Sequence, residues 1–260
     1  DKKREEERLR NEYHARFELL KSDLMDAKQD ITQRISFLEK HRNFLQENPF
    51  RTSRLEDCPA EMYCRMSNSN RDSIFLALTN LEIAKPEKIL HAYYTIPDYL
   101  TPSIKIIREV ADGHSNETYK QLVVIRDAAE YIYSVSRQNG WLGFYPIDCM
   151  IDFANEVTKC LDPKGESNFA HLRSIFISFE LNLQRLIRSN AYKESETELL
   201  KFADQCRIAI TAYTYIETGA KQIIASETTV IEEYQKMIQR CDNVLKDLKN
   251  SSDQESQGIK

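Results

Sequence analysis

Two pairs of side chains have spacings that metal or diphosphate chemistry would use. The first pair, Asp148 and Asp152, lies four residues apart in the segment DCMID, about one helical turn. Paired carboxylates on one helix face can hold Mg²⁺ together with a diphosphate. Such a site needs a denser aspartate cluster and a second acidic set on another helix, and the sequence has neither. Asp148 also falls in the first turn of a predicted helix, where the helix dipole favours a carboxylate, so we expect no catalytic role.

The second pair is Cys58 and Cys64, which have five residues between them and lie near Asp57 and Glu61. A structural zinc site would use CxxC spacing or a nearby pair of histidines, so free thiols are the better interpretation. The other cysteines fall among apolar residues of predicted helices, where a free thiol behaves as a small buried hydrophobe. They are Cys149, Cys160, Cys206 and Cys241. Because a chain of this length needs no disulfide framework, the cysteines indicate a reducing compartment.

Motifs of common enzyme sites are missing from the sequence. It contains no GxxxxGK or GxGxxG loop for phosphates, no HExxH or helical ExxH for metals, and no GxSxG for a nucleophilic serine. We therefore predict no catalytic residue, no metal and no cofactor.

An aromatic turn is the feature that most suggests binding. The segment NGWLGFYPID, residues 139–148, holds the only tryptophan, with Gly140 ending one predicted helix and Pro146 opening the next. One interpretation is a connection whose aromatic side chains fold back on the core. The others are a hot spot for a protein partner and a contact with a membrane interface. The candidate residues are Trp141, Leu142, Phe144 and Tyr145.

A set of cations between residues 159 and 193 could form a basic face for an acidic peptide, a phosphate or an anionic lipid headgroup. Its members are Lys159, Lys164, Arg173, Arg185, Arg188 and Lys193. The competing interpretation is an ordinary solvated face. A polar stripe on the same predicted helix has the same two interpretations, and it comprises Ser174, Ser178, Asn182, Arg185 and Ser189.

Two long heptad patterns occupy the ends of the chain. In residues 1–47 apolar side chains recur mostly every three or four positions, which predicts a helix of about 45 residues that ends before Pro49. A similar pattern runs from Leu199 to Leu248, with a break expected near 226–229, because a second capping box lies there. The N-terminal pattern comprises Tyr13, Phe17, Leu20, Leu24, Ala27, Ile31, Ile35, Leu38 and Leu45.

Shorter and more apolar helices are expected between these two. The segment 73–84 has apolar residues on every face, which predicts a helix buried on most sides. Thr101 and Pro102 at one end and Gly113 at the other bracket a separate short helix. Further helices are predicted over 119–135, 146–161 and 168–190, the last of them as the central core helix.

The composition indicates the fold class. The chain has 260 residues with only 6 glycines and 7 prolines, which favours long helices over turn-rich β folds. We predict an all-α, elongated helical bundle in which long N- and C-terminal heptad helices pack antiparallel with four to five shorter core helices. Residues 1–249 are expected to form a single domain with a mobile loop at 48–72, and 250–260 a disordered tail.

Charge and hydropathy restrict the partners. A net charge of −5 offers no broad positive field for nucleic acid, and no run approaches the ~18 apolar residues of a membrane span. Two heptad helices without a catalytic constellation predict a non-enzymatic cytoplasmic scaffold, adaptor or tether that acts through protein–protein contacts, with a homodimer through the terminal helices. The alternative is a lipid- or membrane-binding helical domain, peripheral at a membrane, that uses the aromatic turn and the basic patch.

Overall fold

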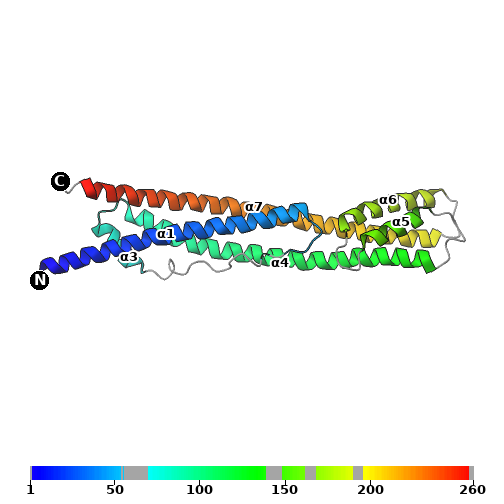
Figure 1. Ribbon diagram of the computed structural model, residues 1–260, viewed down its shortest axis with the longest axis horizontal. Helices are drawn as coiled ribbons and strands as arrows, with labels where there is room; N and C mark the ends of the chain where they lie inside the picture. The colour runs from blue at the N-terminus through cyan, green and yellow to red at the C-terminus, as the bar shows by residue number, and fades with distance from the viewer. Residues whose placement is uncertain are drawn as a thin grey trace. The chain divides into compact units, whose positions relative to one another are not determined.

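The computed structural model describes residues 2–53, 55, 70–138, 148–161, 168–189 and 196–257. All regular structure in these residues is α-helical, which confirms the predicted all-α fold (Figure 1). The helices are α1 (Lys2–Glu47), α3 (Arg71–Asn80), α4 (Pro86–Gln138), α5 (Asp148–Cys160), α6 (Phe169–Arg188) and α7 (Glu196–Gln257). Three of them are long, since α1, α4 and α7 contain 46, 53 and 62 residues.

The chain divides into two compact units. Unit 1 comprises Asp1–Asn43, Leu55–Val110 and Ile224–Lys260, and unit 2 comprises Phe44–Arg54 and Ala111–Ile223. Helices α1, α4 and α7 therefore contribute residues to both units, and the single domain over 1–249 stays a prediction. Helix α7 ends at Gln257, so helical structure extends into the segment 250–260, for which the polar composition predicts a disordered tail.

Within unit 1, α1 and α7 are antiparallel, as the sequence predicts. Lys28 Nζ lies 2.6 Å from Asp242 Oδ1, and His41 Nδ1 lies 2.6 Å from Glu227 Oε1. As the residue number rises along α1, the number of its partner on α7 falls, so the two helices run in opposite directions. Figure 1 shows the beginning of α1 and the end of α7 at the same end of this unit.

The apolar seam of α1 is buried as its heptad predicts, but it also contains charges. Asp23, Arg34 and His41 are at most 8% exposed, although their polarity places them on the surface in a simple heptad. Each has a polar partner: Tyr93 donates to Asp23 at 2.7 Å, Arg34 donates to Asp30 at 3.0 Å, and His41 contacts Glu227. The buried apolar residues of the seam are Phe17, Leu20, Leu24, Ala27, Ile31, Leu38 and Leu45.

Helix α4 is one continuous helix where the sequence predicts several. The prediction of a separate short helix between Pro102 and Gly113 is wrong, because both residues lie inside α4. Gly113 lacks the positive φ of a helix C-cap. The buried positions keep one helical period across both residues, so side-chain packing outweighs the local cost of about 3 kcal/mol for proline and about 1 kcal/mol for glycine. These positions are Ile89, Tyr93, Ile96, Leu100, Ile104, Ile107, Ala111, Ser115 and Thr118.

Helix α7 is also continuous, so the predicted break at 226–229 is wrong. The hydroxyls of Thr228 and Thr229 donate to the carbonyl oxygens of Ile224 and Ala225, at 2.7 and 3.1 Å. A capping threonine would instead accept a hydrogen bond from a backbone N–H of the following turn. The hydroxyls are therefore used inside the helix, and the capping box does not form.

Helix α3 is shorter and more exposed than the pattern over 73–84 predicts. It ends at Asn80, and Phe75 and Leu76 are 37% and 51% exposed. Its beginning is fixed by Asn70, whose Oδ1 accepts two backbone N–H groups at 3.1 and 3.3 Å. The buried side is formed by Ile74, Ala77 and Leu78, so α3 packs on one face only.

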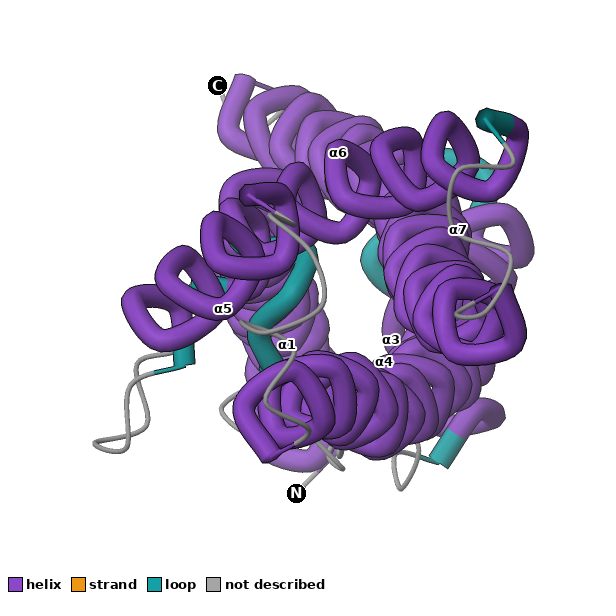
Figure 2. The backbone as a smooth tube through the Cα atoms, turned by 90° about the vertical axis from the view of Figure 1, so that its right-hand side faces the viewer, coloured by secondary structure: helices purple, strands orange, loops and turns teal. Residues whose placement is uncertain are grey.

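Unit 2 is built from the later part of α4, the earlier part of α7, and α5 and α6 (Figure 2). Aromatic rings contact one another within its core: Phe153 stacks on Phe179 with ring centroids 4.4 Å apart and meets Phe176 edge-on at 5.5 Å. Phe50, from the segment after α1, packs edge-on against Tyr213 at 5.2 Å. These contacts hold α5 and α6 on a single apolar core.

Candidate partner-binding surface

Part of the predicted site lies outside the described residues. Trp141, Leu142, Phe144 and Tyr145 belong to the segment 139–147, and Lys164 and Lys193 also fall in segments that the structure does not describe. The aromatic turn therefore stays a prediction. Lys159, Arg173, Arg185 and Arg188 are described, and they belong to α5 and α6.

Helices α5 and α6 form an antiparallel pair. Phe153 contacts Phe176, and Glu156, one turn later on α5, contacts His171, which is earlier on α6. The turn between the helices is closed by Asn168, whose backbone N–H donates to the Cys160 carbonyl at 2.9 Å. The Asn168 side chain also accepts the backbone N–H of His171 at 3.1 Å, so it is the N-cap of α6.

An open groove with a volume of 350 Å³ runs between α5 and α6. Its floor is apolar and consists of Phe153, Ile175 and Phe179. Its walls are polar and consist of Cys149, Asp152, Glu156, His171, Ser174, Ser178 and Asn182. Three residues of the polar stripe predicted from the sequence therefore line a groove, and a pattern of this kind cannot by itself tell a groove wall from a solvated face.

Lys159 is held by its own helix. Its Nζ donates to Glu156 Oε1 at 2.5 Å, and His171 Nε2 lies 3.3 Å from the other carboxylate oxygen. These hydrogen bonds, the one from Lys159 first, lower the pKa of Glu156 below its ordinary value. The hydrogen bond to Glu156 in turn raises the pKa of Lys159. The charge of Lys159 is thus largely matched within the α5–α6 pair.

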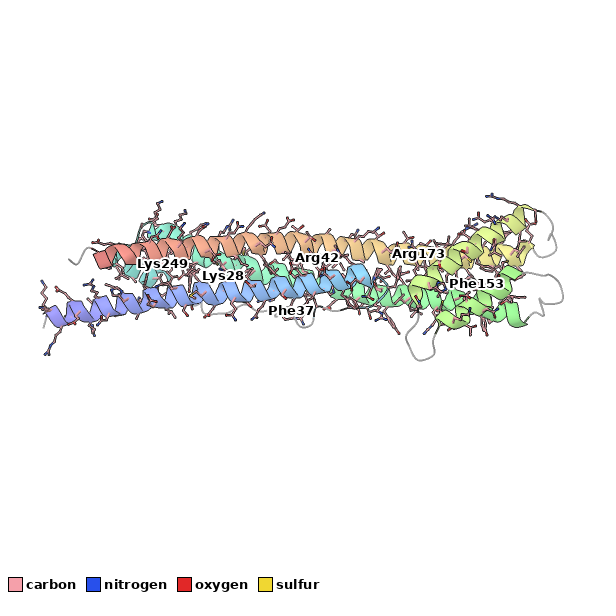
Figure 3. All side chains as sticks on the ribbon, turned by 45° about the horizontal axis from the view of Figure 1, so that its top comes forward. Lys28, Phe37, Arg42, Phe153, Arg173 and Lys249 are labelled. Carbon is pink, nitrogen blue, oxygen red and sulfur yellow. The ribbon has the colours of Figure 1, made fainter. Side chains whose placement is uncertain are left out.

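Arg173 lies on the side of α6 that packs against α7. Its Nη1 donates to Glu217 Oε1 at 2.6 Å, and both side chains are partly buried, with 35% and 25% of their surface exposed. Figure 3 labels Arg173 on α6, next to the α7 ribbon. This contact fastens α6 to α7, which gives Arg173 a structural role.

Arg185 and Arg188 are exposed in the last turn of α6. Cations are favourable there because they offset the negative end of the helix dipole. The four described members of the predicted basic patch thus have three different surroundings: one is paired along α5, one is paired with α7, and two face solvent.

A central core helix over 168–190 would bury all of its apolar residues, but two of them are exposed. Ile177 and Leu181 belong to a second apolar stripe of α6, and they are 39% and 52% exposed. Residues four positions apart share one helix face, so Ile177, Leu181 and Arg185 form one row along the outer surface of α6. Ile151 of α5 is exposed as well, at 44%. We call Ile177, Leu181, Arg185 and Arg188 the outer face of α6.

A second groove, with a volume of 330 Å³, lies in unit 1 between α4 and α7. Its lining consists of Thr95, Asp98, Tyr99, Glu233, Lys236, Met237 and Arg240. Lys236 is paired with Glu233 at 2.6 Å. Because the walls carry both signs of charge, this groove indicates no particular partner chemistry.

Comparisons with protein families, with curated proteins and with solved structures found no match for this chain. Among the residues that the structure describes, no helix is long and apolar enough to cross a membrane. In the same residues, histidine, cysteine, aspartate and glutamate side chains do not gather in groups of three or more that could hold a metal ion.

Proposed function

We propose that this chain is a non-enzymatic helical scaffold or adaptor that binds a protein partner through the outer face of α6. The observation that carries the proposal is the exposure of Ile177 and Leu181, one turn apart on a helix whose opposite side is packed. Burying such side chains against a partner gains about 25 cal/mol for each Å² of apolar surface removed from water.

The support under this face is suited to recognition. On its inner side α6 buries Leu172, Phe176 and Leu183, and Arg173 fastens it to α7. A rigid helix loses little conformational entropy on binding, so more of the contact energy appears as affinity. The long helices α1, α4 and α7 carry exposed surface over many turns, which is what a scaffold or tether requires.

The expected homodimer through the terminal helices stays a prediction. The apolar seam of α1 is already buried within the chain, so a dimer would use residues on its outer side. Leu19 and Met25, which are 47% and 62% exposed, are the apolar residues available there. A cytoplasmic location is also part of the proposal, and it is supported by the burial of Cys160, Cys206 and Cys241 as thiols.

The alternative function is lipid or membrane binding through the aromatic turn and the basic patch. Arg185 and Arg188 favour it, because exposed cations attract anionic headgroups. The two functions differ in what should bind, a protein in one case and a lipid surface in the other.

The test is recovery of a partner from an extract of the source cells with the tagged 260-residue chain. The wild type is compared with the double variant Ile177→Asp/Leu181→Asp and with the control Leu76→Asp. Leu76 is as exposed as Leu181 but lies on α3, in unit 1. We expect a protein that the wild type and the control recover in equal amounts and that the double variant loses.

Recovery of the same proteins by all three chains would contradict the proposal. Binding of the wild type to anionic vesicles, without a protein that depends on Ile177 and Leu181, would favour the lipid alternative.

A further inference from the structure

We infer that the partner segment for the outer face of α6 is an acidic amphipathic helix. This inference rests on the proposed function, because it names the chemistry of the partner for the same face. Three features of the described residues carry it: the spacing of the apolar side chains, the shape of the surface beside them, and the distribution of charge.

The apolar spacing fits a helix. Ile177 and Leu181 are separated by one turn, and Arg188 follows Leu181 after two turns, so the face extends for about 16 Å along α6. Helical partners are commonly held by anchors at positions i, i+3, i+4 and i+7 on one stripe. A partner helix of about four turns would cover the whole face.

The surface beside the apolar pair is shaped so that a partner helix can pack against it. Ser174 and Ser178 are small, exposed and line the groove between α5 and α6. Beside them on α6 lie the exposed apolar side chains of Ile177 and Leu181. Small residues with larger apolar ones beside them allow two helices to approach to about 8–10 Å, with ridges in grooves.

The charge at the end of the face selects an acidic partner. Within the described residues, Arg185 and Arg188 form no ion pair, whereas Lys159 pairs with Glu156 and Arg173 with Glu217. An arginine can hold a carboxylate through two parallel hydrogen bonds. Carboxylates one to two turns beyond the apolar anchors of a partner helix would meet these two guanidinium groups.

The charges around this face give an anionic membrane only weak support as the partner. Two basic residues contribute only about 1 kcal/mol each at an anionic lipid surface. Asp152 and Glu156 line the adjacent groove, and their carboxylates would repel lipid headgroups. A helix can place its own charges selectively, with carboxylates beside the two arginines and neutral or basic side chains beside Asp152 and Glu156.

The test uses two synthetic helical peptides of about 18 residues, stapled to fix the helix. Both carry the same leucine stripe, and one has glutamates beyond one end of the stripe where the other has lysines. Binding to the 260-residue chain is measured by fluorescence anisotropy at low salt and again at high salt. We expect the glutamate peptide to bind about tenfold more tightly than the lysine peptide, with the difference shrinking at high salt.

Charge reversal in the protein provides the matched comparison. The variant Arg185→Glu/Arg188→Glu should reverse the preference, so that the lysine peptide binds more tightly. The control Lys120→Glu/Arg126→Glu changes the charge equally on exposed residues of α4 in the same unit, and it should leave the preference unchanged. Circular dichroism checks that the helix content of each variant equals that of the wild type.

Equal affinity of the two peptides for the wild type would overturn the inference, and so would a preference that survives the charge reversal. Tighter binding to phosphatidylserine vesicles than to either peptide, lost in Arg185→Glu/Arg188→Glu, would overturn it in favour of a lipid surface. The proposed function has a separate test. If a protein is recovered through Ile177 and Leu181 but the peptides show no charge preference, the inference fails and the function stands.

Discussion

His41 and Glu227 place an imidazole and a carboxylate in contact inside unit 1, at 2.6 Å and with the Glu227 side chain fully buried. Burying a charge is costly, and only a partner of suitable geometry compensates for the lost hydration. By contrast, Lys28 and Asp242 join the same two helices at the same distance but are 40% and 50% exposed. The two pairs therefore allow a comparison of buried and exposed polar contacts between α1 and α7.

We expect His41→Leu to lower the free energy of unfolding by about 3 kcal/mol, because it removes one partner of a buried polar pair. The double variant His41→Leu/Glu227→Leu should recover most of that loss, since no carboxylate is then left buried. Lys28→Ala with Asp242→Ala should change stability by less than about 1 kcal/mol. Urea unfolding followed by circular dichroism measures all of these values. Additive losses in the double variant would show that His41 and Glu227 do not act as a pair.

The cysteines make a second prediction at this scale. Burial raises the pKa of the Cys241 thiol from 9.0 to about 11 and also raises that of Cys206, whereas Cys149 is half-buried at the groove. In a Cys58→Ser/Cys64→Ser background, a thiol reagent at pH 8 should modify Cys149 quickly. The three buried thiols, Cys160, Cys206 and Cys241, should react only after unfolding, because the thiolate is the reactive form. Peptide mass spectrometry over time identifies the order, and early labelling of Cys206 would contradict the predicted core.

These raised pKa values also predict the direction in which the free energy of unfolding changes with pH. A folded state that holds a thiol proton more tightly than the unfolded state is most stable below the unfolded pKa. The unfolding free energy should therefore fall as pH rises above about 9, and the contribution of Cys241 should continue to be lost up to about pH 11.

At the scale of elements, two glycines inside long helices have opposite surroundings. A Cβ at Gly113 of α4 would meet nothing within 4 Å, whereas a Cβ at Gly219 of α7 would lie 2.6 Å from His114 Nδ1. Glycine is permissive but costly in a helix interior, where alanine is favoured by about 0.5–1 kcal/mol. Replacing either glycine by alanine gives the same gain in helix propensity. The two positions differ in packing, because only the Cβ at position 219 would meet a neighbouring side chain.

Gly113→Ala should raise the thermal midpoint by a few degrees, as a gain of about 0.5–1 kcal/mol would do. Gly219→Ala should give no increase, because the His114 ring must move and its 3.3 Å contact with Thr118 is disturbed. Calorimetry of the two variants makes the comparison. Equal stabilisation by both would show that His114 does not pack over Gly219.

The helices themselves show how far the sequence can be interpreted. The α1 seam was predictable because its apolar residues recur regularly and have charges on both sides. The continuity of α4 was not predictable. Pro102 and Gly113 usually mark the ends of helices, and only tertiary packing outweighs that local preference. In α6, apolar residues occur on more than one side, and the sequence cannot tell that Phe176 is buried whereas Ile177 and Leu181 are exposed.

The candidate surface was predictable only in part. Arg185 and Arg188 are exposed, as a basic face requires. Arg173 has the same residue type, and its pairing with Glu217 depends on how α6 packs against α7, which periodicity does not specify. The apolar pair was assigned to the core because hydrophobicity alone favours burial. Exposed apolar side chains with regular spacing are recognised only when the helix has a known orientation.

At the scale of the whole molecule, each unit buries an apolar core and leaves some apolar side chains exposed, among them Ile106 and Val110 of α4 in unit 1 and Ile177 and Leu181 of α6 in unit 2. The outer face of α6 displays its apolar pair together with Arg185 and Arg188. The proposed scaffold function depends on that display, so the central claim is that Leu181 contacts a protein.

The most direct measurement is photo-cross-linking from position 181 in an extract of the source cells. One variant carries a photo-reactive amino acid at position 181, and a second variant carries it at position 76 of α3. Each is irradiated in the extract, and the adducts are mapped by mass spectrometry. The account predicts one protein cross-linked from position 181 and not from position 76, through a helical segment, with a yield that falls severalfold when Ile177→Asp is added. The same adducts from both positions, or none from position 181, would contradict it.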